Sequence, residues 1–122
     1  EKGLQCLNQA IEIVGKSYRT YITYKLGNLY EMKAQSLLSA NRLAEAMEEI
    51  DKSDACKMLQ VDENSSEMSW NYQTRAHILI AMDKKPEAKS FMKRALDIRI
   101  VELGEDNDVT MDTKREYDGI EL

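Results

Sequence analysis

Residues that interrupt helices are scarce in this chain. Its 122 residues include 5 glycines and 1 proline, too few for the closely spaced turns of a β sandwich or barrel. No run of about 18 apolar residues occurs, so we expect no membrane-spanning segment. The net charge is -5, which leaves no broad basic face for a nucleic-acid backbone. The sequence therefore predicts long helices and neither nucleic acid nor membrane as a partner.

Histidine and cysteine are nearly absent. The 1 histidine, His77, has no nucleophile or second acid at a spacing that would make it a catalytic base. Cys6 and Cys56 are far apart in sequence, so with a lone histidine they do not form a four-ligand metal site. We expect two small, buried, reduced thiols in an intracellular, cytoplasmic protein, with one disulfide as the alternative. We also expect no enzyme activity, no cofactor and no metal.

The composition is that of a globular domain. Apolar residues make up 43% and charged residues 32%, enough to form a core in a single domain. The chain begins at Glu1 instead of methionine, and no signal peptide is visible. We interpret the sequence as the C-terminal end of a longer repeat array.

A repeat of 42 residues runs through the sequence. The segments 41–47 and 83–89 each carry a Glu-Ala pair, and the same offset relates residues on both sides of them. The matched residues are Tyr30 and Tyr72, Ala34 and Ala76, Leu37 and Leu79, Ala46 and Ala88, Ile50 and Met92, and Lys57 and Arg99. Small residues beside large ones in fixed register predict antiparallel helices that interdigitate.

Apolar periodicity and end signals predict six helices. We place them at about residues 3–14, 18–40, 43–60, 67–82, 86–103 and 108–118. The packing stripe predicted for the second helix consists of Ile22, Leu26, Leu29, Tyr30, Ala34 and Leu37. Asn41 is expected in a left-handed turn, and Pro86 in the first turn of a helix. The single domain 1–122 then contains a trailing helix of a partial repeat (1–15), two repeats (17–60 and 67–104), and a capping helix with a tail (108–122).

The repeat pattern resembles that of the tetratricopeptide repeat (TPR). The matching residues, with Met92 in the aromatic slot, are Tyr72, Ala76, Leu79, Ala88, Met92 and Ala95. The 42-residue unit and the stretch 94–106 are similar to kinesin-light-chain-type repeats and to the C-terminal helical region of SET/MYND lysine methyltransferases. The resemblance implies an all-α, right-handed solenoid of antiparallel helix pairs, about six helices in all. It also implies a concave groove lined by the first helix of each pair.

One stripe of each first helix is a candidate partner-binding surface. It consists of Tyr21, Tyr24, Asn28, Glu31 and Gln35 in one repeat, and of Trp70, Gln73 and His77 in the next. Aromatic rings give contact area at low entropy cost, and amides can hold a peptide backbone. Alternatively, the aromatic residues pack under an adjacent helix. Charged residues of the second helices, including Glu45, Glu49 and Lys93, are expected on a solvated outer face.

These observations favour a non-catalytic protein–protein interaction or scaffold module, which binds a protein or peptide partner in the concave groove. Two alternatives remain. The chain is the C-terminal helical domain of a larger enzyme of the SET/MYND type, whose catalytic residues lie elsewhere. Or the open N-terminal edge of the repeat array joins two copies into a homodimer.

Overall fold

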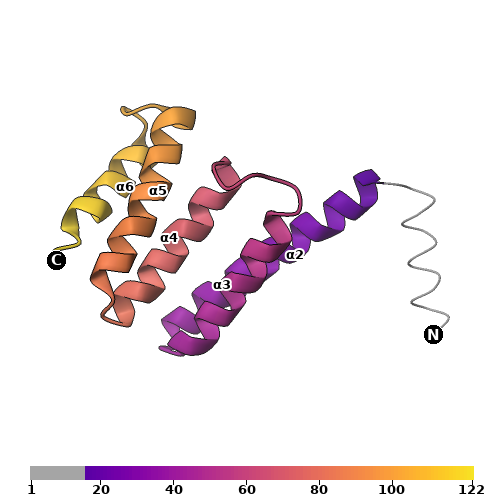
Figure 1. Ribbon diagram of the computed structural model, residues 1–122, viewed down its shortest axis with the longest axis horizontal. Coiled ribbons are helices and arrows are strands. Elements are labelled where there is room, and N and C mark those ends of the chain that lie inside the picture. Colours follow the sequence, from indigo (N-terminus) through magenta and orange to yellow (C-terminus); the bar gives the residue numbers. More distant parts are fainter. Residues whose placement is uncertain (1–15) are drawn as a thin grey trace.

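The protein is a row of antiparallel helices (Figure 1). A computed structural model describes the backbone of residues 16–122 and the side chains of residues 22–122. Its helices are α2 (Lys16–Ser39), α3 (Leu43–Lys57), α4 (Ser66–Ala81), α5 (Lys85–Leu103) and α6 (Asp108–Gly119). No strand occurs in this part of the chain. The predicted all-α solenoid of antiparallel helix pairs is confirmed, and the helix expected at 3–14 lies outside the described residues.

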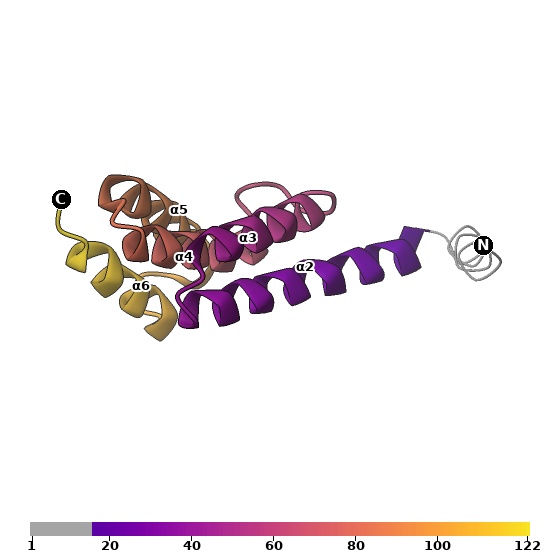
Figure 2. The ribbon, with the colours of Figure 1, turned by 90° about the horizontal axis from the view of Figure 1, so that it is seen from below.

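The helices pack as pairs that stack on one another. Helix α2 packs on α3 and α4 packs on α5, while α3 joins the first pair to the second and α6 closes the row against α5. Helices α2 and α6 lie on one side of the molecule, and α3 and α5 lie on the other (Figure 2). Side-chain hydrogen bonds connect the first helices directly, from α2 to α4 (Gln35 to Thr74) and from α4 to α6 (His77 to Glu116).

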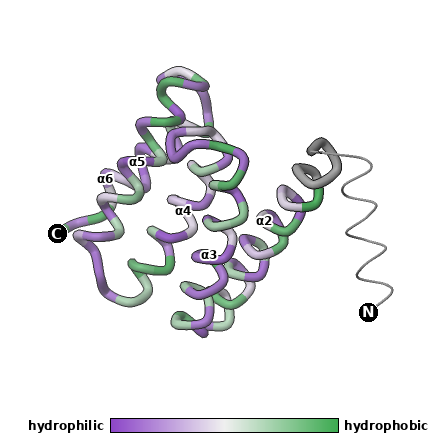
Figure 3. The backbone as a smooth tube through the Cα atoms, turned by 45° about the vertical axis from the view of Figure 1, so that its right-hand side comes forward, coloured by the Kyte–Doolittle hydropathy of each residue, from purple (hydrophilic) through white to green (hydrophobic). Residues whose placement is uncertain are grey.

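Fully buried alanines mark the places where the paired helices approach most closely. Hydrophobic and hydrophilic residues alternate along each helix (Figure 3), so that each buries one stripe. Three clusters form the core of the described residues, and two of them are equivalent: one contains Ala34, Leu37, Ala46 and Ile50, and the other contains Ala76, Leu79, Ala88 and Met92. The members of the two clusters are 42 residues apart in sequence, so the sequence repeat is also a packing repeat.

The turns within the two pairs are also equivalent. Asn41 and Asp83 have φ angles of 59° and 61°, in the left-handed region. In both turns the next backbone N–H donates to a carbonyl five residues earlier, which satisfies an otherwise orphaned carbonyl at the helix end. The left-handed conformation expected for Asn41 is confirmed, and Pro86 lies in the first turn of α5 as predicted.

Two residues of the predicted packing stripe on α2 are not buried. Leu26 and Leu29 are 41% and 59% exposed, so this part of the prediction is wrong. Helix α3 packs against Ala34 and Leu37, which are buried as predicted, and against Gly27, which lies outside the predicted stripe. The spacing of apolar residues three and four positions apart identified one stripe of α2, but this helix carries apolar residues on more than one side. Only the position of α3 decides which stripe is covered.

Glu49 also departs from the prediction, because its side chain is buried instead of lying on the solvated outer face. It accepts a hydrogen bond from Lys52 and forms an ion pair with Lys33 of α2, each at 3.3 Å. The neighbouring Glu45 and Lys93 are exposed, as expected.

Candidate partner-binding groove

Three separate cavities follow one another along the first helices, and each shares a wall residue with the next. The first, of about 350 Å³, lies between α2 and the start of α4, and the second, of about 340 Å³, lies further along the same two helices. The third, of about 540 Å³, lies among α4, α5 and the C-terminal residues. Trp70 lines the first two cavities and His77 lines the last two. We call this row of three cavities the groove.

The groove collects most of the residues predicted from sequence. The first cavity is lined by Tyr24, Asn28, Glu31 and Trp70, the second by Gln35, Trp70, Gln73 and His77. Tyr21 belongs to α2, but its side chain lies outside the described side chains. A helix presents residues three and four positions apart on one side, which is why these positions lie together.

Trp70 is both a packing residue and a groove residue. Its side chain is 50% exposed at the boundary of the first two cavities. The Arg99 guanidinium lies 4.4 Å from the centroid of its ring, and Arg99 itself is held by a 2.6 Å hydrogen bond to the Thr113 hydroxyl. The cation therefore fixes the indole from the core side while the remaining ring surface stays accessible.

Glu31 lies in the wall of the first cavity without a hydrogen-bond donor among the described residues. Its side chain is 13% exposed, and its Oε1 atom lies 3.9 Å from Lys57 Nζ, beyond hydrogen-bond distance. The other oxygen, Oε2, is buried with no partner. Lys57 instead donates to Asn71 Oδ1 at 2.8 Å. Burial raises the pKa of Glu31 above its ordinary value, and the nearby Lys57 only partly offsets this effect.

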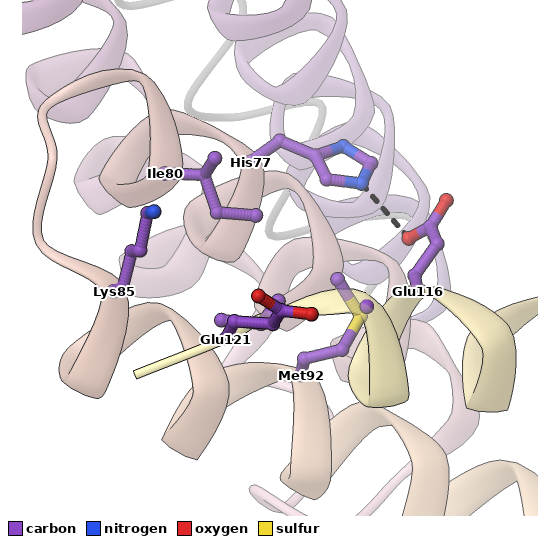
Figure 4. A pocket seen from close by; sticks show the side chains of 8 residues that line it. His77, Ile80, Lys85, Met92, Glu116 and Glu121 are labelled. Carbon is purple, nitrogen blue, oxygen red and sulfur yellow. Dashed lines mark hydrogen bonds and ion pairs between the residues drawn. The ribbon is translucent and has the colours of Figure 1, made fainter.

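The third cavity combines apolar walls with a paired carboxylate. Glu116 lies 2.9 Å from His77 Nε2 (Figure 4). It also accepts a hydrogen bond from Gln73 at 2.8 Å. Burial raises the pKa of Glu116, but the hydrogen bonds from Gln73 and His77 outweigh it and leave the pKa below its ordinary value. Ile80 and Met92 add apolar surface beside this pair.

Several groove-supporting residues were not identified from the sequence. Lys57 and Arg99 are matched by the repeat, but a cation near a helix end normally indicates solvent exposure. Both are buried, at 4% and 2% exposed. Glu116, on α6, was assigned to a charged capping helix. Its contact with His77 depends on how α6 packs, which residue spacing within one helix does not reveal.

Within residues 22–122, no group of three or more His, Cys, Asp or Glu side chains is placed to hold a metal ion. Cys56 is a half-buried free thiol, whereas Cys6 lies outside the described residues. None of the described helices combines the length and hydropathy needed to cross a bilayer.

Comparisons with known proteins give no match: no family model, curated protein or solved structure matches this chain. The functional argument therefore rests on the groove.

Proposed function

We propose that this chain is a non-catalytic interaction module that binds a peptide or a partner helix along the groove. The observation that carries the proposal is the succession of three cavities that share Trp70 and His77 as wall residues. A half-exposed tryptophan held by a buried arginine is a rigid anchor, and such anchors dominate the energetics of many interfaces.

The chemistry of the groove suits an extended peptide. Amide groups of Asn28, Gln35 and Gln73 can donate to and accept from a peptide backbone. The third cavity adds the apolar surface of Ile80 and Met92 for a hydrophobic side chain. A row of distinct pockets can read several consecutive side chains, so the expected partner is a short linear segment.

A peptide library displayed on phage and panned against the purified protein tests the proposal. The affinity of each selected peptide is then measured by calorimetry for the wild type, for Trp70→Ala, and for the control Val101→Ala on the exposed outer part of α5. We expect Trp70→Ala to weaken binding about tenfold or more, as for an interface anchor, and Val101→Ala to leave it unchanged. Peptides that bind equally well to Trp70→Ala, or a library without any Trp70-dependent binder, would contradict the proposal.

Self-assembly is a second candidate function, because α2 exposes an apolar row at the N-terminal edge of the described helices. Leu29 and Met32 are 59% and 61% exposed. Light scattering over a dilution series tests this for the wild type, for Leu29→Glu, and for the control Leu59→Glu at an exposed position after α3. A dimer that only Leu29→Glu dissociates would support a homodimer, and a monomeric wild type would exclude it.

A further inference from the structure

We propose that the first cavity of the groove binds the cationic end of a lysine or arginine side chain, with Glu31 as its acceptor. This inference rests on the proposed function, because it names the chemistry of one pocket of the same peptide-binding groove.

Glu31 is the first reason, because it lacks the hydrogen bonds that a buried carboxylate requires. No described residue donates to either of its oxygens: Oε1 is 3.9 Å from Lys57 Nζ, and Oε2 is buried without a partner. Buried polar groups in native proteins are almost always paired, so an unpaired one needs an explanation. An ammonium or guanidinium group entering the cavity would donate to Oε1, which also lacks a hydrogen bond, and would place a compensating charge beside the carboxylate.

Lys57 does not fill this role, although it lies in the same wall of the cavity. Its ammonium is buried and directed to Asn71 Oδ1 at 2.8 Å. Asn71 in turn donates to Ser53 and Asp54, at 3.0 Å and 2.7 Å, so it is held in place from three sides. Lys57 therefore gives Glu31 only a long ion pair, at 3.9 Å, and no hydrogen bond to either oxygen.

The balance of charge around the cavity also favours a cation. Glu67 shares the cavity wall with Glu31. Asp54 also acts on Glu31 electrostatically, but it forms an ion pair with Arg75 at 2.6 Å. Two cations also act on Glu31: Lys57 donates to Asn71, and Arg99 donates to Thr113 through Nη1 while its Nη2 is buried without a hydrogen-bond partner. Among the charged residues that line the cavity itself, the two carboxylates Glu31 and Glu67 outnumber the one cation Lys57, and this excess attracts a positively charged side chain.

Aromatic rings supply the remaining part of a lysine or arginine site. Tyr24 and Trp70 line the same cavity, and their rings are 39% and 50% exposed. Aromatic surfaces bind the methylene stem of a lysine or arginine and attract its charged end. The other two cavities lack this combination. The second has no carboxylate in its wall, and in the third Glu116 already accepts hydrogen bonds from Gln73 and His77.

A nuclear magnetic resonance titration tests this inference with four blocked pentapeptides. Each has glycine on both sides of one central residue, which is lysine, acetyl-lysine, norleucine or glutamate. The indole N–H of Trp70 reports on the cavity and is unambiguous because the chain has 1 tryptophan. We expect saturable shifts of this signal and of the Glu31 amide with the lysine peptide, and binding at least tenfold weaker with the other three.

The isosteric variant Glu31→Gln should bind the lysine peptide at least tenfold more weakly than the wild type does. The control Glu48→Gln, on the exposed side of α3, should bind it as the wild type does. The comparison of lysine with acetyl-lysine needs no variant, so it remains decisive even if Glu31→Gln folds poorly. Equal binding of the lysine and norleucine peptides, a preference for the glutamate peptide, or no binding of any of the four would overturn the inference.

The outcomes also separate this inference from the proposed function. If library-selected peptides require Trp70 but tolerate both Glu31→Gln and replacement of their basic residues by norleucine, the groove binds peptides and the lysine pocket is wrong. If the lysine peptide binds at Glu31 while the library yields no Trp70-dependent peptide, the pocket exists and the proposed peptide-binding function fails.

Discussion

Lys57 and Arg99 are buried cations 42 residues apart, and each donates a hydrogen bond to the side chain fourteen positions further along the chain. Lys57 bonds to Asn71 at 2.8 Å and Arg99 bonds to Thr113 at 2.6 Å, so the same link joins α3 to α4 and α5 to α6. A cation–aromatic contact also recurs at the 42-residue offset, since Lys52 lies over the Tyr30 ring and Arg94 lies over the Tyr72 ring. Each repeat is thus joined to the next by a buried charged group; Lys57 also lines the first cavity of the groove, and Arg99 contacts the groove residue Trp70.

The hydrogen bond between Lys57 and Asn71 predicts that Asn71→Ala strongly lowers the stability of the protein. Asn71 is fully buried, and its loss leaves the Lys57 ammonium without its hydrogen-bond acceptor in the core. We expect the free energy of unfolding, measured by urea titration, to fall by roughly 2–4 kcal/mol. The equivalent change Thr113→Val should cost less, about 1 kcal/mol, because Arg99 keeps its contact with Trp70. A smaller loss for Asn71→Ala than for Thr113→Val would contradict this reading of the link.

Gly27→Ala should destabilise the protein although alanine favours helices. A Cβ atom on Gly27 would lie 2.9 Å from Lys57 Cγ, where α2 and α3 approach closely. The side chain of Lys57 is buried and held by Asn71, so it cannot move aside freely. The overpacking cost should exceed the gain of about 1 kcal/mol in helix propensity, for a net loss of about 1 kcal/mol.

Gly119→Ala is the matched control for Gly27→Ala, because a Cβ there meets nothing within 4 Å. We expect Gly119→Ala to leave the free energy of unfolding unchanged or to raise it by about 0.5 kcal/mol. Thermal unfolding of both variants gives the comparison. If Gly27→Ala is stabilised as much as Gly119→Ala, the close approach of α2 and α3 at this position is refuted.

Glu31→Gln should make the protein more stable at neutral pH, although Glu31 lies in the proposed binding pocket. Burial raises the pKa of Glu31, so the folded state binds a proton more readily than the unfolded state does. Stability from this group is therefore fully present below the ordinary pKa of 4.5 and is lost as the pH rises through the folded pKa. Removing the charge should raise the free energy of unfolding by on the order of 1 kcal/mol at pH 7.

Urea unfolding at several pH values checks the Glu31 prediction. The advantage of Glu31→Gln over the wild type should disappear at pH values below 4.5, where Glu31 is protonated in both states. Glu48→Gln, at an exposed position on α3, controls for the change in net charge. An advantage that is independent of pH, or a loss of stability at pH 7, would show that the unpaired carboxylate is not unfavourable.

His77→Ala should raise the pKa of Glu116 toward the ordinary value of 4.5. Burial raises this pKa, but hydrogen bonds from Gln73 and His77 lower it further than burial raises it. A carbon-13 titration of the Glu116 carboxyl group measures the shift directly. Met111→Ala, an exposed change on the same helix, should leave the titration unchanged. An unchanged Glu116 titration in His77→Ala would mean that the 2.9 Å contact between the two residues does not persist in solution.

The sequence determined the helices, their pairing and the turns between them. Helix boundaries follow from apolar spacing and from local end signals, such as Asn41 and Pro86, and these act within a few residues. The 42-residue repeat identified the equivalent alanines Ala34 and Ala76, and both are fully buried. Helical spacing also placed Tyr24, Trp70 and His77 on one stripe of their helices, because that geometry is local.

Tertiary structure alone decided which polar groups are buried and which are left unpaired. Leu29 is exposed because α3 covers a different side of α2. Glu49 is buried because it lies between α3 and α2, where it pairs with Lys33. Glu31 lacks a donor because Asn71, forty positions later, holds the nearest cation. Periodicity within one helix reports which side chains share a side of that helix. What faces that side depends on contacts between residues far apart in sequence, which only the packed solenoid brings together.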